Sequence, residues 1–314
     1  MLTTPDLTAG APAAPAPRAV ERPAPTDAPS PPTDPARPGR VNGGRVLMHA
    51  VLIVAGFAFV LPFLWMLLTS FKGLEQLLQA PLSLLPSPWV PGNWLEAWTA
   101  LPFARAYGNS IYLTVVIVAG TIVTSSMAAY GFARIPFKGS QALFWVFLSM
   151  QMVPKQVTLV PFYFLMAQIG WVDSHLALIV PAIMINPFAV FLARQFILSV
   201  PRELEEAALV DGASRWRIFW RIIMPAIRPG LGAIGIIAAL DAWNNFLLPL
   251  VLLNSRELFT VPLLLSQFQG QYGGMNYGIV MAATALSTVP MLIAFIIGQK
   301  QIIASLASSG LGGR

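Results

Sequence analysis

The chain contains no cysteine and only two histidines, His49 and His175, among its 314 residues. Without cysteine it has no disulfide framework, no thiolate metal site and no cysteine nucleophile, and two histidines are too few for a histidine-rich metal centre. Charged residues make up only 10% of the chain, whereas hydrophobic residues make up 56%. Because about a quarter of the residues of a soluble domain are charged, this composition argues against a water-soluble globule.

Long apolar runs dominate the chain after residue 45. Each run is long enough to cross roughly 30 Å of hydrocarbon at 1.5 Å of rise per residue. The predicted fold class is therefore an all-α membrane protein with six transmembrane helices, at about 46–68, 110–133, 142–165, 176–194, 229–252 and 277–299. Proline inside a helix removes a hydrogen bond, so we expect kinks at Pro62, Pro154, Pro161, Pro181, Pro187, Pro249 and Pro290.

The first 45 residues have a different composition. They hold eleven of the 28 prolines, and such a segment can neither continue a helix nor bury a core. We expect residues 1–45 to form a disordered cytoplasmic tail and residues 46–314 to form the transmembrane domain.

The basic residues predict the orientation of the chain in the membrane. Fifteen of the 19 Lys and Arg residues fall on one side of the predicted spans, mainly in the tail and in the 194–228 connection. By the positive-inside rule, both termini then lie in the cytoplasm of a cell-membrane protein. This bias explains the pI near 10.0 without a nucleic-acid partner.

The 199–228 connection has the local signals of a helix-turn-helix. Ser199 is a candidate N-cap of the first helix, and Gly212 can end that helix in the left-handed conformation. Ser214 can cap a second helix that runs to Pro225. In that second helix, apolar and basic side chains follow separate faces, formed by Trp216, Phe219, Trp220 and Ile223 and by Arg217 and Arg221. Such a helix suits either the inner membrane surface or another protein.

Polar side chains interrupt three of the predicted spans. A polar group in hydrocarbon is unfavourable unless it is paired or faces water, so these residues are candidates for lining a path through the membrane, and amides beside aromatic rings would suit a sugar. Hydrogen bonds between helices are the alternative role, and Lys155 and Asp241 are candidates for a mutual ion pair. The candidates are Gln151, Lys155, Gln156, Asn186, Asp241, Trp243, Asn244 and Asn245.

The same connection resembles a known family. Glu206-Ala207-Ala208, three residues, Gly212, nine residues and then Ile222-Ile223-Met224-Pro225 is similar to the EAA loop of binding-protein-dependent ABC transporter permeases, with Met224 in place of the family's Leu. The flanking residues 199–205 and 211–214 look like the carbohydrate-uptake class 1 branch, the maltose-permease-like subunits. Further matches to that branch are Asn109-Ser110, residues 170–174 and 177–181, Trp243-Asn244 and Gly310-Leu311-Gly312-Gly313, where Gly312 replaces a frequent Lys.

The resemblance implies a permease subunit of an ATP-driven sugar importer. Its expected partners are a second homologous permease, an ATPase dimer, an extracytoplasmic sugar-binding protein and membrane lipid. In the family the EAA helix docks on the ATPase, which assigns ATPase coupling to Glu206, Ala207, Ala208, Asp211, Gly212 and Pro225 within a coupling loop at 199–228. The outer segment with Gln267, Gln269, Gln271 and Tyr272 corresponds to one that contacts the binding protein.

Other functional classes fit the sequence less well. The chain has no G-x-x-x-x-G-K-[ST] sequence, so we expect it to bind no cofactor and ATP to be hydrolysed by a partner subunit. A stand-alone secondary carrier would show repeated halves and an ion-coupling carboxylate, for which Asp241 is the one candidate. A membrane-bound enzyme would need a carboxylate or metal cluster, and the glutamates at 203, 205 and 206 instead fit a helix start. The sequence predicts no catalytic residue and does not distinguish a sugar from another polyol.

Overall fold

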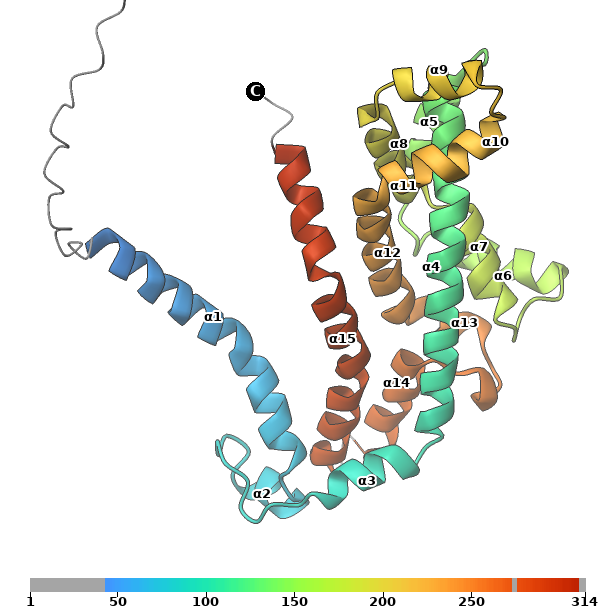
Figure 1. Cartoon of the computed structure of the whole chain (residues 1–314). Coiled ribbons are helices and arrows are strands. Elements are labelled where there is room, and N and C mark those ends of the chain that lie inside the picture. Colours follow the sequence, from blue (N-terminus) through green and yellow to red (C-terminus); the bar gives the residue numbers. More distant parts are fainter. Residues whose placement is uncertain (1–42, 273–275, 311–314) are drawn as a thin grey trace, which may run out of the picture. The chain divides into compact units, whose positions relative to one another are not determined.

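The computed structural model describes residues 43–272 and 276–310, so the predicted tail lies outside the described residues except at its end. Within the described part every regular element is a helix (Figure 1). The elements up to residue 199 are α1 (Gly43–Ser70), α2 (Leu74–Gln79), α3 (Gly92–Thr99), α4 (Phe103–Arg134), α5 (Ser140–Ser149), η1 (Met150–Met152), α6 (Leu159–Gln168), α7 (Leu176–Met184) and α8 (Pro187–Ser199). The remaining elements are α9 (Glu203–Val210), α10 (Arg215–Ile218), η2 (Phe219–Ile223), α11 (Met224–Ala226), α12 (Arg228–Trp243), α13 (Leu247–Leu252), η3 (Arg256–Leu258), α14 (Val261–Tyr272) and α15 (Tyr277–Gly310).

The chain divides into two units, Met1–Ala55 and Gly56–Arg314. Both clusters of buried apolar side chains lie in the second unit. There α4 packs against α7, α8 and α12, and α15 packs against α3, α12 and α14. The core is therefore built around α4, α12 and α15.

Membrane-spanning length and apolarity are found in four helical segments of the described residues: Leu47–Ser70, Phe103–Arg134, Leu176–Ser199 and Tyr277–Gln299. A fifth candidate is the pair Arg215–Ala226 and Arg228–Trp243, which is bent by 79°. These segments confirm an all-helical membrane protein.

Three predicted spans are not single continuous helices. The run predicted at 142–165 breaks between η1 and α6, the run at 176–194 breaks between α7 and α8, and the run at 229–252 breaks between α12 and α13. Proline explains the difference. Pro161, Pro187 and Pro249 each lie in the first turn of a new helix, where a missing N–H has no consequence, whereas Pro62, Pro181 and Pro290 lie inside helices.

Asp173 joins the connection between α6 and α7 to the connection that follows α13. Asp173 adopts a left-handed backbone conformation with φ of 59°, and its N–H donates to the Leu252 carbonyl at 2.7 Å. Its carboxylate accepts hydrogen bonds from the backbone N–H groups of Asn254 and Ser255, both at 2.8 Å, and from the Ser255 hydroxyl. The hydroxyl and these two N–H groups lower the pKa of Asp173.

These hydrogen bonds predict a pH-dependent difference in stability between wild type and a variant without the Asp173 carboxylate. The pKa of Asp173 is lower in the folded state than in the unfolded state. Its contribution to the free energy of unfolding is therefore complete above the ordinary pKa of about 3.9, and it is lost as the pH falls through the folded-state pKa. We expect Asp173→Asn to lower the unfolding temperature in detergent by about 2–4 °C at pH 7, and the gap from wild type to close below about pH 4. An equal difference in unfolding temperature at pH 7 and at about pH 3.5 would contradict this role of the Asp173 carboxylate.

Candidate functional site

The EAA segment, residues 203–226, lies across one end of α4 (Figure 1). Gly212 ends α9 with φ of 79°, and the Ser214 hydroxyl accepts a hydrogen bond from the Arg217 N–H at 3.3 Å at the start of α10. Both features confirm the predicted helix-turn-helix. The predicted cap at Ser199 is wrong, because Ser199 ends α8 and its hydroxyl donates to the Phe196 carbonyl.

A buried ion pair holds this segment in place. Arg134 Nε at the end of α4 lies 2.6 Å from Glu205 Oε1, with 4% and 8% of the two side chains exposed. The Tyr130 hydroxyl donates to Glu205 Oε2 at 3.2 Å, while the Arg134 guanidinium donates to the carbonyls of Ile197 and Val200. One arginine therefore joins α4, the end of α8 and α9.

The next glutamate along α9 points the other way. Glu206, Ala207, Asp211 and Gly212 are exposed, and Ala208 is half-buried. Apolar side chains surround this exposed face, with 51% of Leu204, 88% of Val210, 60% of Trp216 and 38% of Trp220 exposed. The EAA segment thus presents a mixed acidic and apolar surface, which we call the coupling face.

The second helix of the segment is anchored on one side and bent at its end. Ile218, Phe219 and Ile223 are buried, and the Phe219 ring lies 5.5 Å from the Tyr130 ring. The five residues before Met224 form a π-helix, since Pro225 cannot donate to the Arg221 carbonyl. The helix continues through exposed Pro225 to Ala226, and the 79° bend to α12 follows.

Five of the predicted path residues share a second site. Gln151, Lys155, Asn186, Asp241 and Asn245 line a cavity of about 450 Å³, the central cavity. Its other lining side chains are mostly apolar and come mainly from α4, α6, α7, α8, α12 and α13, among them Ile117, Phe162, Leu178, Pro181, Phe188, Ile237 and Leu248. Gln156 is exposed and is not among the lining residues.

The central cavity lies where three helical segments break. Residues 150–158 separate α5 from α6, Ile185-Asn186 separate α7 from α8, and residues 244–246 separate α12 from α13; each break contributes a lining residue. Threonines of α4 satisfy backbone carbonyls near the second break, with Thr124 Oγ1 donating to the Ile183 carbonyl at 2.6 Å. Non-helical backbone at membrane depth is tolerated where it lines a water-filled cavity or is buried in protein, and broken helices mark solute sites in transporters.

Two charged residues face each other in the central cavity. Lys155 Nζ lies 3.3 and 3.4 Å from the two carboxylate oxygens of Asp241, which confirms the pairing considered from the sequence. The amides have local partners as well: Asn186 Oδ1 accepts from the Ala189 N–H at 3.0 Å, and Asn245 Oδ1 accepts from the Leu248 N–H at 3.4 Å.

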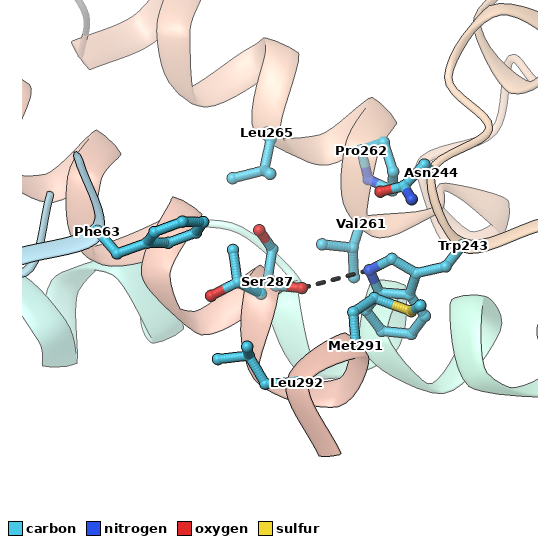
Figure 2. A pocket seen from close by; sticks show the side chains of 10 residues that line it. Phe63, Trp243, Asn244, Val261, Pro262, Leu265, Ser287, Met291 and Leu292 are labelled. Atoms are coloured by element: carbon cyan, nitrogen blue, oxygen red, sulfur yellow. Dashed lines mark hydrogen bonds between the residues drawn. The ribbon is translucent and has the colours of Figure 1, made fainter. Parts of the chain in front are cut away.

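Trp243 and Asn244 lie at a separate cavity of about 350 Å³ (Figure 2). Trp243 is only 5% exposed, and its indole N–H donates to the Ser287 carbonyl at 3.3 Å. Asn244 Nδ2 donates to the Leu240 carbonyl at 2.9 Å. The structure therefore separates these two residues from the other path candidates: Trp243 is buried and bonds a carbonyl of α15, whereas Asn244 is exposed and bonds a carbonyl of its own helix.

The predicted binding-protein contacts fall on α14. Gln267 is half-buried there, and the segment predicted to be an outer connection is thus largely helical. The side chains of Gln269, Gln271 and Tyr272 lie outside the described residues. Among the side chains that are described, no group of three or more His, Asp or Glu could hold a metal ion.

Comparison with known proteins gives the family. Residues 117–306 match the binding-protein-dependent transport system inner membrane component. The fold and the match define a multi-pass inner-membrane transport protein. The chain belongs to this family of ABC transporter permeases.

Several curated relatives match most of the chain. It is 37% identical to the arabinooligosaccharides transport system permease protein AraQ of Halalkalibacterium halodurans, over 83% of this chain and 96% of the relative. It is 31% identical to the trehalose/maltose transport system permease protein MalG of Thermococcus litoralis, over 86% and 98%. A chain of a bacterial ABC transporter involved in the import of alginate has a similar fold, with a TM-score of 0.72 and 22% identity over 84% of this chain and 99% of that one.

Substitutions of the two neighbouring glutamates are expected to differ in their effect on stability. Glu205→Gln leaves Arg134 with no buried carboxylate, so we expect a loss of about 3 kcal/mol in the free energy of unfolding. Glu206→Gln changes an exposed side chain, so we expect a change within about 0.5 kcal/mol. Denaturant unfolding of the two purified variants in the same detergent measures the difference, and equal values would contradict the anchoring role of Glu205.

Proposed function

We propose that this chain is one permease of an ATP-driven importer of saccharides, coupled to a cytoplasmic ATPase dimer through the coupling face. It works beside a second homologous permease and receives its solute from an extracytoplasmic binding protein. The observation that carries the proposal is the EAA segment itself: Glu205 is buried and fixes the helix, while Glu206, Ala207 and Gly212 remain exposed. If the EAA segment served only to cover the core, it would not leave apolar side chains exposed on the coupling face.

The coupling residues have distinct roles in this proposal. Glu206 and Asp211 supply negative charge for basic residues of the ATPase, and Ala207 and Ala208 permit close approach of its surface. Gly212 provides the turn between the two short helices, and Pro225 lies just before the bend to α12. Exposed apolar side chains around them supply the buried area that a protein interface needs.

The central cavity supplies half of the translocation path. The second permease supplies the other half. Six spans then cross the membrane, and each of the three broken runs crosses as a pair of shorter helices. Arabinooligosaccharides, trehalose and maltose in the names of relatives support a saccharide as the solute. Both termini lie in the cytoplasm, and the outer segment around Gln267 faces the binding protein.

A cycle of alternating access follows from this arrangement. A loaded binding protein docks outside, ATP closes the ATPase dimer, and the EAA segment moves with it as a rigid body because its anchor is buried. A stand-alone secondary carrier is the alternative. The exposed Asp241 is its candidate coupling carboxylate, but its pairing with Lys155 leaves it without the free charge that ion coupling needs.

The partner assignment predicts what co-purifies with the chain. We expect an ATPase and a second permease to be recovered with wild type from solubilised membranes. Glu206→Lys reverses a charge on the coupling face, so we expect ATPase recovery to fall about tenfold or more while the second permease is retained. Glu96→Lys, at an exposed position of α3, is the matched control. A chain that purifies alone and still moves solute in liposomes would establish the carrier instead.

The turn at Gly212 predicts an uncoupled variant. Proline fixes φ near −65°, which is incompatible with the φ of 79° at this position, and it removes the N–H that donates to the Leu209 carbonyl at 3.0 Å. We expect Gly212→Pro to insert into the membrane but to lose ATP-driven uptake. Gly212→Ala keeps the N–H and should retain more uptake. Normal uptake by Gly212→Pro would contradict the rigid coupling segment.

A further inference from the structure

The central cavity contains one charge of each sign. Among its lining side chains within the described residues, Lys155 is the one cation and Asp241 the one anion. They come from separate elements, Lys155 from the break before α6 and Asp241 from α12, and the ammonium contacts both carboxylate oxygens. The lining of this cavity therefore has no net charge.

The pair is too exposed to serve mainly for stability. The Lys155 side chain is 78% exposed and that of Asp241 is 68% exposed, and such exposed ion pairs contribute little to folding. Ionisable groups at membrane depth are nonetheless unfavourable to retain, so by default they indicate a functional role. Their exposure toward the open side of the cavity means that a solute in the path meets both groups.

The chemistry of the pair fits a neutral polyhydroxy solute. The ammonium offers three donors and the carboxylate only acceptors, so adjacent hydroxyls can bind both at once. Gln151, Thr158 and Asn186 add neutral polar groups to the same lining. An acidic solute gains from Lys155 but is repelled by Asp241 about one hydrogen-bond length away, and the two effects largely cancel.

The fold alone does not decide the charge of the solute. A similar fold occurs in a transporter of the acidic polysaccharide alginate, so any discrimination made by the permease itself must come from its side chains rather than from its fold. Like charges brought together during recognition are strongly disfavoured, and such repulsion is a general source of specificity.

Building on the proposed function, we infer that the Lys155–Asp241 pair is a charge-selectivity element. It keeps the path electrically neutral, so that the permease accepts uncharged saccharides and rejects those that carry a uronic acid or an amine. Removing either partner leaves a single charge in the cavity and shifts the preference toward solutes of the opposite sign.

The test uses the complete transporter in nanodiscs without the binding protein, because the binding protein makes its own selection. Equilibrium binding is measured for three probes of equal length: maltotriose, the same trisaccharide oxidised to a uronic acid at the terminal C6, and its terminal C6 amine. The variants are Asp241→Asn, Lys155→Met and the double variant. Glu96→Gln on α3 is the control, since it removes one exposed acidic charge outside the cavity.

We expect wild type and Glu96→Gln to prefer maltotriose. In Asp241→Asn, the affinity for the uronic acid relative to that for maltotriose should rise about tenfold. In Lys155→Met, the relative affinity for the amine should rise about tenfold. The double variant should again prefer maltotriose. A misfolded cavity cannot produce this reciprocal pattern.

Equal probe ratios in all variants, or no specific binding of any probe, would overturn the inference. Uptake of a neutral saccharide by the wild-type transporter with ATP and its binding protein is measured in parallel. If uptake occurs while the ratios of probe affinities are equal in all variants, only the inference about charge selectivity fails. If ATP drives no uptake, the proposed function fails with it.

Discussion

The buried ion pair between Arg134 and Glu205 is the contact on which the position of the EAA segment depends. Removing two charges from water is unfavourable, and it is offset only when the geometry is good and the remaining polar atoms are satisfied. Here the Tyr130 hydroxyl bonds the second carboxylate oxygen, and the guanidinium also reaches carbonyls at the end of α8. The position of α9 is thereby fixed against α4 and α8, so a force on the exposed side of α9 reaches the core directly.

The same helix that holds the EAA segment also supports the central cavity. Toward its middle, α4 contributes Ile117 to the cavity lining, and its Thr124 satisfies the carbonyl of Ile183 before the break between α7 and α8. Gly120 lies between these positions, and a Cβ there would overlap the Ile183 side chain. Close approach of α4 and α7 therefore makes the hydrogen bond possible, and the broken segment keeps a defined geometry.

Local signals account for what the sequence could predict. Gly212 and Ser214 specify a turn and a cap through their own backbone and side chain, so the helix-turn-helix was predictable. Glu205 and Glu206 are neighbours of the same residue type, and their separation into a buried anchor and an exposed contact depends on Arg134, about 70 residues away. Only tertiary structure supplies that distinction.

The cavity shows the same limit. Polar residues within apolar runs indicated the candidate path residues, and prolines indicated where the helices could break or bend. That the three breaks meet at one cavity, and that Trp243 instead bonds a carbonyl of α15, follows from packing between segments distant in sequence. Periodicity within one run contains no information about either.

The bend between α11 and α12 connects the two sites. From Arg228 to Asp241, α12 extends about 20 Å at 1.5 Å per residue, and hydrogen bonds within the helix keep this length constant. Displacement of the EAA segment must then rotate or translate α12 as a unit. Because Lys155 lies on a different segment, such a movement changes the separation of Lys155 and Asp241. In the proposed cycle, the Lys155–Asp241 ion pair is therefore also a contact that a displacement of the EAA segment alters, which links the charge of the proposed path to the coupling step.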